Sequence, residues 1–166
     1  MSKIAGVYWD DTAAAPGISL SVYFSGCHFH CPGCHNPEAW DFNYGEDFTP
    51  DKLQEIADKL HKNGVDRRLS ILGGEPLCDE NLPDVALLIS YIKQLYPDTI
   101  VYVWTGYTYE ELLERNEPLL MHIFELIDVL IDGRYEQDKR DTTLALRGSV
   151  NQRIIRLKEN ITATTV

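Results

Sequence analysis

Apolar residues along the chain follow two different periods, and the alternation predicts strands separated by amphipathic helices. Runs rich in β-branched and aromatic residues predict strands over residues 18–25, 68–72, 99–104, 128–132 and 152–157. Apolar residues three to four positions apart predict one helix between Thr49 and Asn63, a second from Asn81, and a helical stretch from Thr108 that restarts at Pro118. This order is typical of βαβ units, so the predicted fold class is α/β with a largely parallel sheet.

The segments that follow four of these strands are unusually rich in glycine and polar residues. They are residues 26–34, 73–76, 105–107 and 132–134. Parallel α/β sheets bind their ligands at the carboxyl ends of the strands. We therefore expect these four segments to meet at one end of the sheet and to form the functional site.

Length and composition limit the class of protein further. With 166 residues, of which 44% are hydrophobic and 25% charged, the chain fits one globular domain spanning residues 1–166. A net charge of −11 argues against nucleic acid or an anionic membrane as a partner, because both attract clustered cations. The N-terminus lacks the apolar core of a signal peptide, and no apolar run reaches membrane-spanning length. We therefore expect a soluble, cytoplasmic protein.

The positive charge is concentrated in one part of the chain. Residues 134–158 hold seven basic and three acidic residues, a net charge of +4 (7 − 3), within a chain of net charge −11. This stretch is interpreted either as a solvated basic face or as a docking surface for an acidic partner or an anionic ligand.

Three of the four cysteines lie close together, at Cys27, Cys31 and Cys34. Thiolates at such spacing on one loop can converge on one metal centre. Four interpretations remain open, namely free thiols, a redox pair of Cys31 and Cys34, an iron–sulfur cluster, and a zinc site with a fourth ligand from His28, His30, His35 or Cys78. The redox pair leaves Cys27 unused, and zinc sites usually have two separated ligand arms, of which this sequence shows one. An iron–sulfur cluster would use all three cysteines and leave one iron of a four-iron cube without a protein ligand.

Taken in order, these cysteines and the later Gly73-Gly74-Glu75-Pro76 segment resemble the radical S-adenosylmethionine (SAM) superfamily. Many members have an aromatic residue just before the last cysteine, where this chain has Gly33. The Pro32-Gly33-Cys34 version of the motif, followed by Asn36, resembles the activating enzymes of glycyl-radical enzymes. Within that branch, segments 31–40, 103–107, 130–134 and 147–152 resemble activases of anaerobic (class III) ribonucleoside-triphosphate reductases, over about residues 16–156.

The resemblance implies a [4Fe–4S] cluster on Cys27, Cys31 and Cys34, with SAM bound at the fourth iron. It further implies that an electron from a reduced donor such as flavodoxin cleaves SAM, and that the resulting 5′-deoxyadenosyl radical takes hydrogen from a glycine of the partner reductase's glycyl-radical subunit. Since 166 residues are few for a complete radical SAM barrel, we expect an abbreviated, open (βα) partial barrel with a broad mouth.

The resemblance also implies a set of residues around SAM: Gly33, Cys34, His35, Gly73, Gly74, Glu75, Thr105, Asp132 and Arg134. Glycines permit close approach of the backbone to a ligand. Three members have two interpretations each. Glu75 could assist SAM electrostatically or stabilise its loop, and Arg134 could pair with the SAM carboxylate or be solvent-exposed. Asp132 could lie at a SAM or monovalent-cation site, or could stabilise the turn before Gly133. Cys78 is interpreted as a structural thiol, and His28 and His30 as residues that shield the cluster or tune its hydrogen bonding.

Two other functions are considered as alternatives. The first is the activase of another glycyl-radical enzyme, such as pyruvate formate-lyase, which the Cys-His-Asn segment 34–36 also fits. The second is a zinc-binding interaction module without catalytic activity. Metal content and the response to SAM distinguish the zinc module from either activase.

Overall fold

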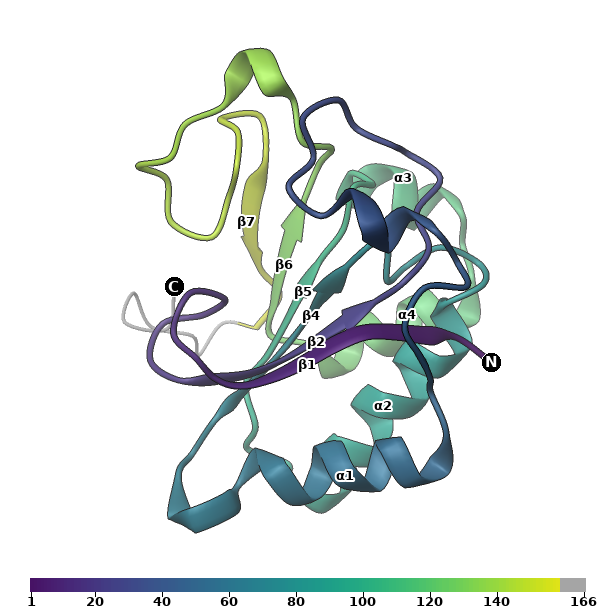
Figure 1. The fold of residues 1–166 in the computed structure, drawn as a ribbon, viewed down its shortest axis with the longest axis vertical. Coiled ribbons are helices and arrows are strands. Elements are labelled where there is room, and N and C mark those ends of the chain that lie inside the picture. The colour runs from purple at the N-terminus through teal and green to yellow at the C-terminus, as the bar shows by residue number, and fades with distance from the viewer. Residues whose placement is uncertain (159–166) are drawn as a thin grey trace.

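The computed structural model describes residues 1–158, so residues 159–166 of the expected domain lie outside the described residues. Its centre is one sheet of seven strands in the order β3-β1-β2-β4-β5-β6-β7 (Figure 1). The strands are β1 (Lys3–Asp11), β2 (Ser19–Phe24), β3 (Glu46–Asp47), β4 (Arg68–Gly73), β5 (Val101–Trp104), β6 (Val129–Asp132) and β7 (Arg153–Arg156). Strands β2, β4, β5 and β6 are parallel, whereas β1, β3 and β7 pair antiparallel. The mixed α/β class is confirmed, and the sheet is parallel in its centre.

Four helices begin where the sequence predicts them: α1 (Pro50–Leu60), α2 (Leu82–Leu95), α3 (Tyr109–Glu114) and α4 (Pro118–Leu126). The Thr49 hydroxyl accepts a hydrogen bond from the Lys52 amide at 3.2 Å and so caps α1. Thr108 and Glu111 form the predicted capping box at the start of α3. Within residues 1–158 we find no helix whose length and hydropathy together would suffice for a bilayer crossing.

The hydrophobic core lies between the sheet and helices α1, α2 and α4 (Figure 1). The apolar stripes predicted for α1 and α2 are buried against it, including Ile56, Leu60, Leu88 and Ile92. A smaller apolar cluster around Tyr102 covers part of the other side. The segments that follow β2, β4, β5 and β6 gather around the carboxyl ends of these parallel strands (Figure 1). The longer connections after β2 and β6 contain short 3-10 helices, Pro37–Trp40 and Gln137–Lys139.

Two strands were not predicted. β1 pairs with β2, but its register shifts between Ile4 and Gly6 and again between Trp9 and Asp11. Such bulges break the alternation of apolar and polar positions that identifies a strand in a sequence. β3 has only two residues and pairs only with the start of β1, so it has no pattern of its own.

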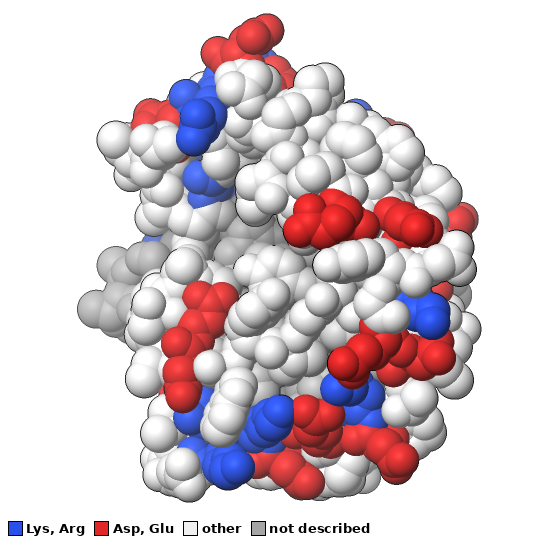
Figure 2. All heavy atoms as spheres, in the orientation of Figure 1, with Lys and Arg blue, Asp and Glu red and all other residues white. Residues whose placement is uncertain are grey.

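The basic stretch 134–158 is not a continuous positive surface. Ion pairs join four of its cations to acids: Arg134 to Glu111, Lys139 to Glu136, Arg153 to Glu110 and Asp132, and Lys158 to Asp128. Figure 2 shows basic and acidic side chains interspersed at the end of the molecule where the turn 137–139 lies. Among the described residues, Arg140, Arg147 and Arg156 have no ion pair.

Candidate functional site

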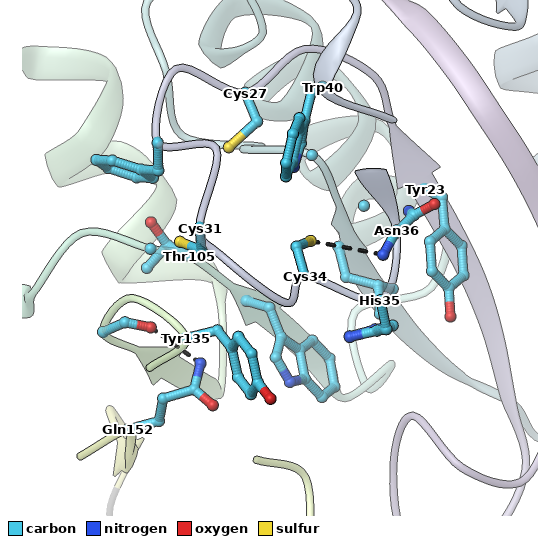
Figure 3. A pocket seen from close by; sticks show the side chains of 17 residues that line it. Tyr23, Cys27, Cys31, Cys34, His35, Asn36, Trp40, Thr105, Tyr135 and Gln152 are labelled. Carbon is cyan, nitrogen blue, oxygen red and sulfur yellow. Dashed lines mark hydrogen bonds between the residues drawn. The ribbon is translucent and has the colours of Figure 1, made fainter. Parts of the chain in front are cut away.

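A cavity of about 760 Å³, measured out to its open mouth, lies at the carboxyl ends of the parallel strands (Figure 3). The loop after β2 lines it with Cys27, Phe29, Cys31, Cys34, His35, Asn36 and Trp40. The other strand ends contribute Leu72, Gly73, Gly74, Trp104, Thr105, Gly106 and Gly133. The structure therefore brings together the four glycine-rich segments that follow the strands, as expected.

The loop of the three cysteines is held by its own backbone. The Gly26 amide donates to the Ala39 carbonyl at 2.8 Å, and the Cys27 amide donates to the Trp40 carbonyl at 3.1 Å. These bonds close the segment between Cys27 and Trp40 into a loop over the strand ends. At its tip the Cys34 amide donates to the Cys31 carbonyl at 3.0 Å, which forms a tight turn.

All three thiols face the cavity (Figure 3). Cys27 is buried, whereas Cys31 and Cys34 are half-buried, and none forms a disulfide. Burial raises the pKa of the Cys27 thiol; burial and then the neighbouring Cys34 raise the pKa of Cys31. Among residues 1–158, no three His, Cys, Asp or Glu side chains lie close enough together to hold a single metal ion. The thiols instead surround a shared hollow.

Gly73 and Gly74 line the cavity with backbone. Their loop touches the cysteine loop directly, because the Glu75 amide donates to the Gly26 carbonyl at 2.7 Å. A Cβ atom at Gly73 would overlap the backbone of Phe24, and a Cβ at Gly74 would overlap the carbonyl oxygens of Gly26 and Ala39. Glycine is therefore needed here for the contact between the two loops as well as for exposing backbone to a ligand.

Glu75 lies behind the cavity wall and is 1% exposed. Its carboxylate accepts hydrogen bonds from the Leu77 amide at 2.9 Å, the Thr105 hydroxyl at 2.8 Å and the Gly106 amide at 2.6 Å. The structure thus places Glu75 where it joins the loops after β4 and β5. Burial raises the pKa of Glu75 to about 7, although these three donors oppose the shift.

The raised pKa of Glu75 predicts a pH-dependent stability. Between its ordinary pKa of 4.5 and about 7, the folded protein holds a proton that the unfolded chain has released. We therefore expect the contribution of Glu75 to the free energy of unfolding to be greatest below pH 4.5 and to fall by roughly 3 kcal/mol as the pH rises to 7, at about 1.4 kcal/mol per pH unit. Urea unfolding of the wild type and of Glu75→Gln across this range would measure the difference.

A matched control for this titration is Glu125→Gln, which alters an exposed glutamate of α4. Its stability profile is expected to run parallel to the wild type, whereas the Glu75→Gln profile lacks the decline. A Glu75→Gln profile parallel to the wild type between pH 5 and 7 would show that Glu75 does not hold the proton.

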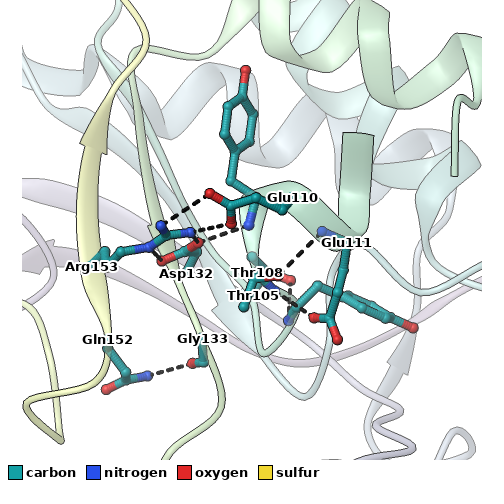
Figure 4. Close-up of polar contacts among 10 residues, drawn as sticks. Thr105, Thr108, Glu110, Glu111, Asp132, Gly133, Gln152 and Arg153 are labelled. Carbon is teal, nitrogen blue, oxygen red and sulfur yellow. Dashed lines mark hydrogen bonds and ion pairs between the residues drawn. The ribbon is translucent and has the colours of Figure 1, made fainter. Parts of the chain in front are cut away.

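Asp132 and Arg134 do not line the cavity. Asp132 instead lies against Arg153 (Figure 4). Asp132 is fully buried, and its carboxylate accepts from Arg153 at 2.5 and 3.0 Å and from the Tyr109 amide at 2.8 Å. Arg134 lies over the Phe29 ring at 4.3 Å and pairs with a glutamate of α3 at 3.4 Å. Both residues thus support the strand end and loop that surround the site.

Of the other residues singled out in the sequence, some line the cavity and others do not. Thr105 and His35 line the cavity, whereas Gly33 forms the turn before Cys34 and does not. Cys78 is 1% exposed and also lies outside the lining, and burial raises its pKa to about 12. That position agrees with the interpretation of Cys78 as a structural thiol.

Five aromatic side chains of the cavity wall were not predicted from the sequence. They are Tyr23, Phe29, Trp40, Trp104 and Tyr135, and Gln152 adds a polar group. Trp40, Trp104 and Gln152 lie in segments that carry the family resemblance, but the sequence assigned no role to their side chains. The position of Trp104 at the end of β5 was the one available signal.

Comparisons with known proteins agree with this site. A family model described as a 4Fe-4S single cluster domain matches residues 13–155. A protein of Escherichia coli (strain K12), an anaerobic ribonucleoside-triphosphate reductase-activating protein, is 36% identical over 149 residues, which cover 89% of this chain and 94% of the relative. Proteins of the same name from Pasteurella multocida (37% identical, covering 92% of this chain and 96% of the relative) and Enterobacteria phage T4 (32%, covering 89% and 90%) are also similar.

Proposed function

This chain belongs to the family of anaerobic ribonucleoside-triphosphate reductase-activating proteins, and we propose from that premise that it activates such a reductase by reductive cleavage of SAM at a [4Fe–4S] cluster. One observation supports the proposal above the others: three thiols of one loop face a cavity at the carboxyl ends of the parallel strands. The open sheet of the described residues 1–158 supports an abbreviated radical SAM barrel, and the chain is proposed to form one domain.

The donor set fits an iron–sulfur cluster. Cys27, Cys31 and Cys34 would each supply one thiolate, which leaves one iron of a four-iron cube for SAM. When bound, the cluster and SAM supply a one-electron reduction and the alkyl radical that removes hydrogen from a glycine of the reductase. A reduced protein such as flavodoxin is the proposed source of the electron.

The chain's own residues bind and orient these groups and exclude water. The backbone carbonyls of Gly73 and Gly74 would accept hydrogen bonds from the ammonium group of SAM, and the backbone of Gly33, Cys34 and His35 would lie near its adenosyl group. The aromatic walls, including Trp40 and Trp104, make the cavity largely apolar. Glu75 contributes by holding the Thr105 loop, and Asp132 by holding β7, without direct contact with SAM.

Electron paramagnetic resonance of the reconstituted protein tests the proposal. Protein purified anaerobically, loaded with iron and sulfide and reduced with dithionite is expected to give a [4Fe–4S] signal that changes when SAM is added. Adding the anaerobic reductase is then expected to produce a glycyl radical on that partner. Bound zinc and no cluster signal would instead support a zinc module. A radical on pyruvate formate-lyase alone would indicate the other activase.

A further inference from the structure

A groove continues the cavity to the surface of the protein. It has about 850 Å³ of space, measured out to its open mouth, and its walls include Ala13 and Ala14 on one side and Leu146, Arg147 and Gly148 on another. The groove and the cavity share six residues, namely Tyr23, His35, Leu72, Trp104, Tyr135 and Gln152. A segment of a partner protein lying in this groove would reach the hollow that the thiols surround.

One side chain joins the wall of the groove to the floor of the cavity. The Gln152 side-chain oxygen accepts hydrogen bonds from the Gly148 amide at 2.8 Å and the Ser149 amide at 3.2 Å. Its side-chain nitrogen donates to the Gly133 carbonyl at 2.9 Å (Figures 3 and 4). Gly133 follows β6 and lines the cavity, whereas Gly148 lines the groove.

The chemistry of these contacts explains why the residue is glutamine. Two backbone amides require an acceptor, and one backbone carbonyl requires a donor, and the side-chain amide of glutamine supplies both. Glutamate lacks the donor, and asparagine is one methylene shorter. The wall itself is closely packed, since a Cβ atom at Gly148 would lie 3.0 Å from the Tyr135 ring.

We propose that Gln152 is a positioning residue for the protein substrate. By joining Gly133 to Gly148 and Ser149, its amide keeps the groove open toward the cavity, so that an extended segment bearing the target glycine can enter. Because the groove leads into the cavity, we assign it to the segment of the reductase that must reach the reaction site. The inference therefore rests on the proposed function. The resemblance had identified the segment 147–152 without giving it a role.

The test compares three variants in the loaded, full-length protein. Gln152→Ala removes all three hydrogen bonds, whereas Gln152→Glu keeps an acceptor for the two amides and loses the donor to Gly133. Asn151→Ala is the matched control, because Asn151 donates one hydrogen bond from the same segment to the Arg134 carbonyl at 2.7 Å and lines neither space. The rate of glycyl-radical formation, measured against reductase concentration, gives kcat and KM for each.

Both Gln152 variants are expected to raise the KM for the reductase about tenfold and to lower kcat less than threefold. Asn151→Ala is expected to keep KM within about twofold of the wild type. A wild-type KM in either Gln152 variant, or an equal rise in Asn151→Ala, would overturn the proposal, because the connection to Gly133 would then be dispensable or the effect merely a loss of stability.

Hydrogen exchange separates this inference from the proposed function. Without cofactor or partner, the amides of Gly148 and Ser149 are expected to exchange at least about tenfold faster in Gln152→Ala than in the wild type, and to stay protected in Gln152→Glu. Unchanged exchange in Gln152→Ala would overturn the bridging role of Gln152. A wild-type protein that forms no radical on the reductase would instead reject the proposed function.

Discussion

Cys31→Ala is expected to abolish cluster binding and glycyl-radical formation, whereas Cys78→Ala keeps both. Cys31 faces the cavity together with Cys27 and Cys34. Without Cys31, only two of the three thiolates would remain to hold the cluster. Cys78 lies outside the lining, and burial raises its pKa to about 12, so it remains a neutral thiol within the fold. Iron and sulfide content, visible absorption and the radical yield on the reductase measure the effect.

The Cys78 variant is the matched control because it also removes one thiol from the fold. Cys78 is 1% exposed, so replacement with alanine is expected to cost about 1 kcal/mol of stability through a small cavity. A Cys78→Ala protein without iron would reassign this thiol as a ligand. A Cys31→Ala protein that retained iron and activity would remove the main support for the proposed site.

Gly73→Ala is expected to destabilise the fold by about 4 kcal/mol, the second-largest effect. Gly73 has φ of +121°, a conformation that L residues rarely adopt, and an added Cβ would overlap the backbone of Phe24 in β2. Backbone strain costs roughly 1–3 kcal/mol and overpacking a similar amount. The neighbouring strand cannot move without disturbing the cysteine loop that follows it, so cluster loading should fall as well.

Gly64→Ala separates the cost of backbone strain from the cost of the overlap with neighbouring atoms. Gly64 also has a positive φ, of +71°, but no atom lies within 4 Å of the position that its Cβ would take. It is therefore expected to lose only about 1 kcal/mol, from backbone strain alone. Urea unfolding of the metal-free proteins gives both values, and equal losses in the two variants would show that the overlap at Gly73 is relieved by movement.

The parts of the fold that could be predicted are those where pattern and environment agree. The four central strands are largely buried on both faces, so they appear in the sequence as mainly apolar segments. Helices α1 and α3 begin at capping residues, Thr49 and Thr108, that the sequence shows directly. β1 was missed because its bulges disturb the alternation. Its place in the sheet depends on pairing with β2, which is a tertiary interaction that no local pattern records.

In the candidate site, too, the sequence shows local patterns but not contacts between distant segments. The cysteines and glycines could be identified because their residue types and spacing have chemical meaning within one segment. The roles of Glu75, Asp132 and Arg134 could not be resolved, because their partners Thr105, Arg153 and Glu111 lie far away in the sequence. Those partners hold the buried carboxylates of Glu75 and Asp132 in hydrogen-bond networks and pair the exposed Arg134 with Glu111.

The aromatic wall gives the protein a built-in optical reporter. Of the three tryptophans, Trp40 and Trp104 line the cavity, while Trp9 lies on β1, close to the cations of Lys59 and Lys62. Indole emission responds to the polarity and the absorbing groups around it. Filling the cavity would therefore change the emission of two indoles and leave the third as an internal reference. Occupancy of the site could be followed in solution without attaching a dye.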